Sequence, residues 1–337
     1  MRAAVVTDFH AALEFQERDV PVPGPHEVLV RIECTGLCGT DIHAAHGEWP
    51  TTPSLPFVPG HEGIGRIAEL GRDVTIRAVG DRVAISWLGS ACGMCRHCVG
   101  GRETLCEEQH NSGYSVDGTF ADYAVVPAAF ATPVPDGVTS RDAAPLTCAG
   151  VTTFKAVKVA GVAPAETVAV FGIGGLGHLA VQYARIAGGQ VIAVDVEQDK
   201  LILATELGAD HVVNARDSDP VVAIQALGGA DVALALAASP GSIDQAYRSL
   251  RRGGRLVCVA MPAGDAAMSV PVFDLVVGGK SVIGSIVGTR NDLADVFALH
   301  AAGRTRVVAE DRKLDDVNAA MADVEAGRVT ARVVLHV

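Results

Sequence analysis

A glycine-rich turn constrains the fold of this chain more than any other feature of its sequence. Gly172, Gly174 and Gly177 form the pattern GxGxxG between an apolar run, Thr167–Phe171, and a helical run. The first glycine permits a tight turn, the second lets the backbone approach a pyrophosphate, and the third lets a helix pack closely against the strand. The phosphate charge would lie at the helix N-terminus. We therefore expect the strand, turn and helix of a dinucleotide-binding domain.

The sequence around this turn predicts a parallel sheet. Further apolar runs at 190–195, 231–237, 254–261 and 281–287 alternate with helical patterns. Buried strands that alternate with helices are typical of βαβ units. We expect residues 151–287 to form an α/β domain of the Rossmann type, with a doubly wound parallel sheet that binds NAD.

The remaining residues have a different pattern. Residues 1–150 contain short β-rich runs separated by turns rich in glycine and proline, which predicts a β-dominated domain with long loops. Residues 288–337 contain two helical patterns and a final strand pattern. We expect this last segment to return to the first domain.

An acidic residue at the end of the second strand favours NAD over NADP. Asp195 follows the run 190–194, where its carboxylate can accept hydrogen bonds from ribose hydroxyls and would repel a 2′-phosphate. Lys200 is a candidate second contact with the ribose. The alternative is that Asp195 caps the next helix, a common position for aspartate.

Four thiols in the run CGMCRHCVGGRETLC indicate a structural zinc site. Their spacing lets one short loop close around a tetrahedral ion, and such a closed site stabilises structure. A disulfide pair or unrelated core thiols are the alternatives, and the absence of a secretory segment disfavours disulfides. The predicted ligands are Cys92, Cys95, Cys98 and Cys106.

Composition narrows the classes of partner. The net charge of −12 argues against a nucleic-acid surface, which needs clustered lysine and arginine. The N-terminal residues lack the basic and apolar segments of a signal peptide, and the sequence has no long uncharged apolar stretch. We expect a cytoplasmic protein that binds a small molecule, with no nucleic acid and no membrane as partner.

Several motifs together carry a resemblance to a known family. They are CGTDxHxxxGxWP from Cys38, PGHEGIG from Pro59, the four-cysteine loop, NSGYSVDGTFADY from Asn111, TCAGVTTFKAVK from Thr147, and VFGIGGLGH. Across its whole length the chain resembles zinc-dependent alcohol dehydrogenases of the medium-chain dehydrogenase/reductase superfamily. It is most similar to the bacterial tetrameric branch, because the region after the four-cysteine loop lacks the insertion of longer relatives.

The resemblance implies an architecture and an assembly. Residues 1–150 and 288–337 would form a GroES-like catalytic domain with two zinc sites, and residues 151–287 the NAD-binding domain. The assembly would be a homotetramer, and the apolar run 281–287 could form an edge strand that pairs between subunits.

The resemblance also implies a catalytic zinc site. Cys38, His61 and Cys148 would be its ligands, with Glu62 able to approach the metal during ligand exchange. Asp41 would accept the second ring N–H of His61 and so orient that ligand.

Two more residues would move protons. Thr40 matches the hydroxyl that contacts the substrate oxygen, and His43 the acceptor at the end of a relay through the nicotinamide ribose. His46 could be confused with His43, but we interpret it as a structural residue on a helix surface.

The resemblance also implies that one positively charged side chain contacts the coenzyme. Arg332 matches a pyrophosphate-binding arginine, with a surface charge on an edge strand as the alternative. Gly39 departs from relatives that carry arginine or histidine there, so we expect looser NAD binding. The remaining implied coenzyme contacts are Ile173, Gly175, Leu176, Val259, Ala260, Ser285 and Val287.

The expected reaction is oxidation of an alcohol to an aldehyde or ketone, and its reverse. Zinc would stabilise the alkoxide and hydride would move to nicotinamide. Trp49, Trp87 and Leu88 would line the alcohol pocket, which suits small primary, allylic, benzylic or secondary alcohols. Cys148 disfavours sugar alcohols, because polyol dehydrogenases usually carry glutamate at that ligand position.

Three other functions compete with this interpretation. An NADP-linked aldehyde reductase or cinnamyl-alcohol-type dehydrogenase is disfavoured by Asp195. A non-catalytic NAD and zinc redox sensor would be expected to lose catalytic ligands. A zinc hydrolase would not need the dinucleotide motif.

Overall fold

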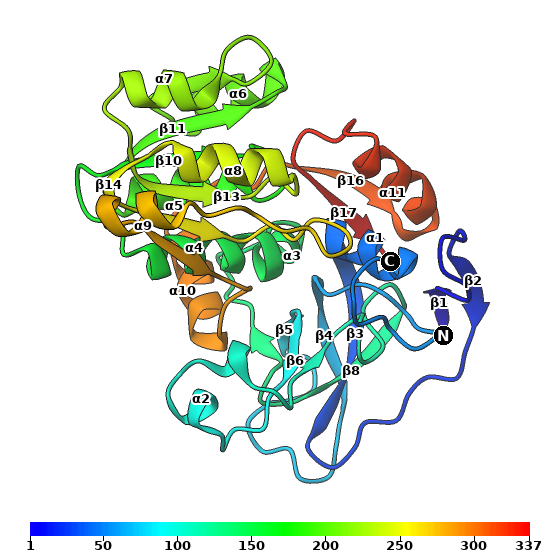
Figure 1. Cartoon of the computed structure of the whole chain (residues 1–337). Coiled ribbons are helices and arrows are strands. Elements are labelled where there is room, and N and C mark those ends of the chain that lie inside the picture. Colours follow the sequence, from blue (N-terminus) through cyan, green and yellow to red (C-terminus); the bar gives the residue numbers. More distant parts are fainter. The chain divides into compact units, whose positions relative to one another are not determined.

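The computed structural model describes residues 1–337, and they divide into two compact units (Figure 1). Unit 1 contains Met1–Val151, Val287–Gly303 and Val307–Val337. Unit 2 contains Thr152–Ile286 and the short stretch Arg304–Arg306.

Unit 2 is built on one parallel sheet of six strands. The strand order is β12-β11-β10-β13-β14-β15, and every neighbouring pair is parallel. This order is that of the Rossmann fold, so the predicted fold of this half is confirmed. The strands are β10 (Thr167–Phe171), β11 (Gln190–Asp195), β12 (His211–Asn214), β13 (Ala230–Ala235), β14 (Leu250–Cys258) and β15 (Ser281–Gly284).

Buried apolar residues explain why these strands lie inside unit 2. Phe171, Ile192, Ala233 and Leu256 belong to one core cluster and are at most 1% exposed. Helices connect successive strands, as a parallel sheet requires. They are α5 (Gly177–Ile186), α6 (Gln198–Glu206), α7 (Pro220–Ala226), α8 (Pro240–Arg248) and α9 (Val272–Gly278). Helix α4 (Val151–Ala160) comes before β10, the first strand of this sheet in the chain.

Unit 1 is built around the long strand β3. A seven-stranded sheet has the order β16-β17-β3-β4-β5-β9, with β8 also paired to β3. Two smaller sheets pair β1 with β2 and β6 with β7. The strands are β1 (Arg2–Val5), β2 (Glu14–Glu17), β3 (Glu27–Leu37), β4 (Gly63–Leu70), β5 (Arg82–Ile85), β6 (Leu88–Ser90), β7 (His110–Asn111), β8 (Tyr123–Pro127), β9 (Thr132–Pro133), β16 (Ala309–Lys313) and β17 (Arg332–His336).

Short helices fill the connections of unit 1. A π-helical turn, Leu146–Gly150, follows α3 directly and carries Cys148. The α-helices are α1 (Gly39–His46), α2 (Arg96–Val99), α3 (Ser140–Pro145), α10 (Arg290–Ala301) and α11 (Val317–Glu325). Short 3-10 helices span Glu103–Leu105 and Leu314–Asp316.

The last segment of the chain adds one strand that the sequence did not predict. Strand β16 pairs in parallel with the terminal strand β17, which lies between β16 and β3. Because the sequence of β16 is AEDRK, it has no apolar pattern by which a strand could be recognised.

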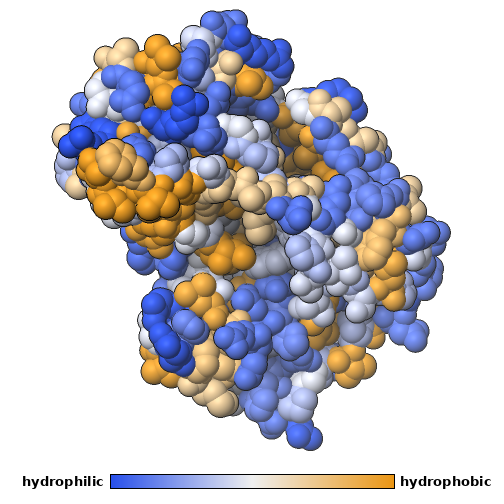
Figure 2. Space-filling model, viewed as in Figure 1, coloured by the Kyte–Doolittle hydropathy of each residue, from blue (hydrophilic) through white to orange (hydrophobic).

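An apolar surface gathers on α9 in unit 2 (Figure 2). Val272, Phe273 and Val276 are 72%, 79% and 71% exposed. The neighbouring strand β15 lies at the edge of the six-stranded sheet. No helix of the protein combines the length and the apolar character needed to cross a membrane.

The glycine turn has a steric reason for two of its three glycines. Gly172 has a φ of 96°, a conformation that side chains with a Cβ rarely adopt. A Cβ on Gly177 would lie 2.0 Å from the carbonyl oxygen of Gly172, whereas a Cβ on Gly174 would meet nothing within 4 Å. Gly177 therefore allows α5 to start against the end of β10.

We expect Gly177→Ala to lower the free energy of unfolding by about 1–3 kcal/mol, because the new methyl group overlaps backbone. Gly174→Ala is the matched control and should unfold at nearly the wild-type urea concentration. Equal midpoints for the two variants would contradict this steric role.

Candidate active site and metal centres

Cys38, His61 and Cys148 come together in unit 1 from three separate segments. Cys38 lies between β3 and α1, His61 precedes β4, and Cys148 lies in the π-helical turn. With Glu62 they form a group whose ligand atoms all lie within 4.8 Å of one another. All are buried, and Nε2 of His61 has no hydrogen-bond partner. An unpartnered buried imidazole nitrogen facing two thiols fits a metal ligand, since buried polar atoms are normally paired.

Asp41 organises this group through three hydrogen bonds. Its Oδ1 accepts from His61 Nδ1 at 2.8 Å and from the Gly60 N–H at 3.2 Å, while Oδ2 accepts from the Cys38 N–H at 2.9 Å. The carboxylate is 1% exposed. Because Nδ1 donates to Asp41, the neutral ring has its lone pair on Nε2, the atom that faces the thiols.

Electrostatics within the group favour a thiolate. Hydrogen bonding with Cys148 holds the pKa of Cys38 well below its usual value against the effect of burial, and the same contact raises the pKa of Cys148. Burial alone would lower the pKa of His61, but the charges and hydrogen bonds of Asp41 and Cys38 together raise it. The thiolate is the form of cysteine that binds metals.

Arg332 forms a buried ion pair with Glu62, and this corrects one sequence interpretation. Its guanidinium donates to Glu62 Oε1, and the two side chains are 4% and 0% exposed. Strand β17 is internal to its sheet, so the alternative of a surface charge on an edge strand is wrong. Burial raises the pKa of Glu62 to about 7, although Arg332 opposes the rise.

Thr40 and His43 lie on α1, directly after Cys38. They are one helical turn apart, so they share a face of that helix. His43 Nδ1 lies 2.5 Å from Oε2 of Glu48, a partner that sequence reasoning missed. His46 is half-buried at the end of α1, with its Nδ1 3.5 Å from Oε1 of Glu48. A Cβ on Gly39 would meet nothing within 4 Å, so the turn has room for a larger side chain.

An aromatic chain connects His43 with His61. The Trp49 ring stacks on the His43 ring, with 5.2 Å between the ring centroids. The centroid of the Tyr114 ring lies 5.8 Å from that of Trp49 and 5.4 Å from that of Trp87. The Trp87 ring in turn meets the His61 ring edge-on, with 5.3 Å between the centroids. Sequence reasoning missed Tyr114, although it lies in the motif NSGYSVDG. The structure therefore connects the two predicted pocket tryptophans through a third ring.

Leu88, the third predicted pocket residue, lies with Trp87 in a separate small hollow of unit 1. Trp87 and Leu88 line a small hollow together with Val287, Thr147 and Leu293. Val287 has a positive φ of 33° and lies two residues before Thr289, the N-cap of α10. Trp87 thus contributes both to this hollow and to the aromatic chain.

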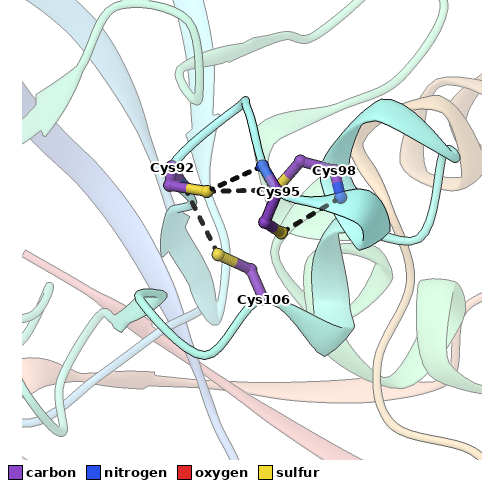
Figure 3. A group of neighbouring side chains, drawn as sticks. All are labelled: Cys92, Cys95, Cys98 and Cys106. Atoms are coloured by element: carbon purple, nitrogen blue, oxygen red, sulfur yellow. Dashed lines mark hydrogen bonds between the residues drawn. The ribbon is translucent and has the colours of Figure 1, made fainter.

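The four-cysteine loop forms a second group of possible ligands (Figure 3). The side chains of Cys92, Cys95, Cys98 and Cys106 point toward one another, and their sulfur atoms lie within 4.8 Å of one another. Backbone N–H groups of Met94 and Cys95 lower the pKa of Cys92 to about 7. None of the eight cysteines forms a disulfide, so this arrangement of thiols fits zinc.

The predicted nucleotide residues of unit 2 collect where its parallel strands end. The glycine turn follows β10 and Asp195 ends β11, while Val259 and Ala260 follow β14 and Ser285 follows β15. The carboxyl ends of such strands are the usual ligand edge of an open α/β sheet. Within the turn lie Ile173, Gly175 and Leu176, and Lys200 lies in the first turn of α6.

Asp195 is tied to the glycine turn. Its Oδ2 accepts from the Ile173 N–H at 2.6 Å, and its Oδ1 accepts from the N–H groups of Val196 and Glu197 at 2.8 and 3.0 Å. Helix α6 has Glu197 as its N-cap. Asp195 therefore does not cap that helix, and the alternative interpretation of this residue is wrong.

Comparisons with known proteins agree with both halves of the structure. The alcohol dehydrogenase GroES-like domain matches residues 24–136, and the zinc-binding dehydrogenase family matches residues 175–302. An alcohol dehydrogenase of Geobacillus stearothermophilus is 48% identical over 336 residues, which are 99% of this chain and 98% of the relative. The chain belongs to the zinc-binding alcohol dehydrogenases.

Further relatives support the same family. An alcohol dehydrogenase of Moraxella sp. is 46% identical over 99% of each chain. The crystal structure of the alcohol dehydrogenase from the hyperthermophilic archaeon Aeropyrum pernix has a TM-score of 0.93 at 34% identity and covers 100% of both chains. The predicted family, the GroES-like and Rossmann folds and the enzyme class are thus confirmed.

We expect Arg332→Met to destabilise this alcohol dehydrogenase by about 3 kcal/mol at pH 8, because Glu62 would be left as an unpaired buried carboxylate. Burial already raises the pKa of Glu62. The difference in the free energy of unfolding between wild type and variant should therefore become smaller as pH falls toward 6, where Glu62 of the folded variant can bind a proton. Urea unfolding at both pH values measures this difference.

The double variant Glu62→Gln, Arg332→Met is the matched control. It removes both charges and should recover most of the lost stability at pH 8. A double variant no more stable than Arg332→Met alone would contradict a paired role for these residues.

Proposed function

We propose that this enzyme oxidises primary alcohols, including benzylic ones, to aldehydes with NAD and zinc, and that it also catalyses the reverse reaction. Secondary alcohols and the corresponding ketones are also proposed as substrates. The observation that carries the proposal is the buried group of Cys38, His61 and Cys148, in which His61 Nε2 has no partner. Two thiols and one imidazole leave a fourth tetrahedral position for a substrate oxygen.

Each chain would hold two zinc ions. Cys38, His61 and Cys148 would hold the catalytic ion, and the four-cysteine loop the structural one. When bound, the catalytic ion would act as a Lewis acid on the alcohol oxygen. Glu62 would stay close enough to exchange with a ligand, because it belongs to the same group.

The side chains of α1 would remove the proton. The Thr40 hydroxyl would accept the proton of the alcohol oxygen while it passes on its own hydroxyl proton. His43 would accept the relayed proton and release it to water, because a neutral imidazole has one nitrogen that can accept a proton. Their common helix face and the half-exposed position of His43 support this route. Asp41 acts through His61, whose orientation it controls.

The nucleotide residues of unit 2 would hold NAD, which supplies the hydride acceptor. The glycine turn leaves space beside Gly174 for a pyrophosphate. The Asp195 carboxylate, fixed against Ile173, places a negative charge at this edge and disfavours a 2′-phosphate. Arg332 would act on the pyrophosphate from its ion pair with Glu62.

The aromatic chain supports the proposed class of substrate. Trp49, Tyr114 and Trp87 form one continuous aromatic surface that ends at His61. Flat apolar groups gain from contact with such rings, so benzylic and allylic alcohols suit the surface better than sugar alcohols.

The proposal includes a cytoplasmic homotetramer. The free edge of β15 and the exposed apolar face of α9 support pairing between copies of unit 2. Six of the eight cysteines would bind zinc, and cysteines stay available as metal ligands in a reducing compartment.

We expect NADH to form from primary and benzylic alcohols, with much slower turnover when NADP replaces NAD. Chelation should abolish activity and added zinc should restore it. Cys148→Ser should lose more than about a hundredfold in turnover, a loss above that for residues that only orient a ligand.

Cys34→Ser is the matched control, because its thiol donates to the Ser140 carbonyl oxygen and a hydroxyl can do the same. It should keep near wild-type turnover. Equal turnover with NADP, or activity that survives complete zinc removal, would contradict the proposal.

A further inference from the structure

The end of helix α1 turns the chain back toward His43. Gly47 has a φ of 65°, and its N–H donates to the Ala44 carbonyl oxygen at 3.2 Å. The Glu48 N–H donates to the His43 carbonyl oxygen, also at 3.2 Å. A Cβ on Gly47 would lie 3.0 Å from the Phe9 ring, so only glycine fits this tight reversal.

The reversal places the Glu48 carboxylate between two imidazoles. Oε2 lies 2.5 Å from His43 Nδ1, and Oε1 lies 3.5 Å from His46 Nδ1. The Trp49 ring stacks on the His43 ring. The hydrogen bond from His43 is the main reason that the pKa of Glu48 is lowered. Glu48 is thus an ionised carboxylate at neutral pH.

A carboxylate can only accept hydrogen bonds, and this determines the state of the histidine. The neutral His43 ring must carry its proton on Nδ1 to donate to Glu48, which leaves the lone pair on Nε2. We propose that Glu48 is a positioning residue for the proton relay: it holds His43 in the Nδ1–H form and stabilises the ring when Nε2 gains a proton. This inference rests on the proposed function of His43.

The proton balance is simple. Nε2 of His43 accepts the proton released from the alcohol, the ring becomes an imidazolium with both nitrogens protonated, and Nε2 then releases that proton to water. The Nδ1 proton stays in its hydrogen bond to Glu48 throughout. A carboxylate beside an imidazole has this role in hydrolase triads.

Other titratable groups around the helix end provide a control. His46 Nδ1 lies 3.6 Å from Oε1 of Glu325 on α11, and the His46 ring stacks on His10 at 4.8 Å. Glu325 therefore contacts the same cluster through His46. Glu325→Gln removes a nearby negative charge without removing the proposed partner of His43.

The first test follows the ring directly in zinc-loaded protein without coenzyme. Nitrogen-15 NMR of histidine-labelled protein reports which ring nitrogen carries the proton, and His43→Gln identifies the His43 signals. We expect the Nδ1–H form in the wild type and in Glu325→Gln. In Glu48→Gln a mixture of both forms should replace it, because an amide can donate as well as accept.

The second test uses alcohol oxidation across pH. Glu48→Gln should lower kcat by about tenfold or more, within the range for general base catalysis, with KM for the alcohol nearly unchanged. The acid side of its pH–rate profile should move to lower pH, because the imidazolium loses a stabilising charge. Glu48→Asp should restore part of kcat, and Glu325→Gln should leave both kcat and the profile unchanged.

The outcomes separate the two proposals. An unchanged His43 tautomer and a normal kcat in Glu48→Gln, with His43→Gln impaired, would overturn the role of Glu48 alone. Normal turnover in His43→Gln would overturn the relay, and with it the catalytic role of Glu48. Absence of alcohol oxidation in wild-type protein would overturn the proposed function, while the NMR result would still decide whether Glu48 controls the ring.

Discussion

The buried carboxylate of Asp41 is the contact on which the rest of the catalytic unit depends. One side chain joins the N–H of Cys38, the N–H of Gly60 and the ring of His61. It therefore connects the end of β3, the start of α1 and the turn before β4. Because Asp41 lies in the first turn of α1, its charge also interacts favourably with the helix dipole. The position of His61 Nε2 and the direction of α1 follow from this carboxylate.

Two carboxylates thus orient two imidazoles within one short stretch of chain. Asp41 leaves Nε2 of His61 facing the thiols, and in our proposal Glu48 leaves Nε2 of His43 free to accept a proton. The environments differ: Asp41 is 1% exposed, whereas Glu48 is partly open to solvent. The buried histidine suits a metal ligand and the half-exposed one suits exchange of protons with water.

Local signals in the sequence were sufficient for much of the fold. The glycine turn and the alternating apolar runs predicted the parallel sheet, because each unit of that pattern lies within a short stretch of chain. Strand β16 was missed because its residues are polar and only pairing with β17 makes it a strand. The family resemblance named the site residues of α1, whereas nothing in the sequence singled out Glu48.

Long-range contacts account for the other differences between sequence and structure. Arg332 and Glu62 are 270 residues apart, so their buried pairing has no local signature. Tyr114 joins the two tryptophans only after the loop before β8 has folded. Asp195 looked like a possible helix cap until the structure tied its Oδ2 to Ile173.

The organising role of Asp41 can be tested by measuring zinc content after dialysis against a competing chelator, in wild-type protein and in Asp41→Asn. We expect two zinc ions per wild-type chain, one for each group of ligands. In Asp41→Asn the metal at His61 should bind about 10–100-fold more weakly and be lost, while the four-cysteine loop keeps its ion. Equal retention of two ions by both proteins would contradict the organising role of Asp41. A wild-type chain that binds one ion would contradict the proposed catalytic zinc site.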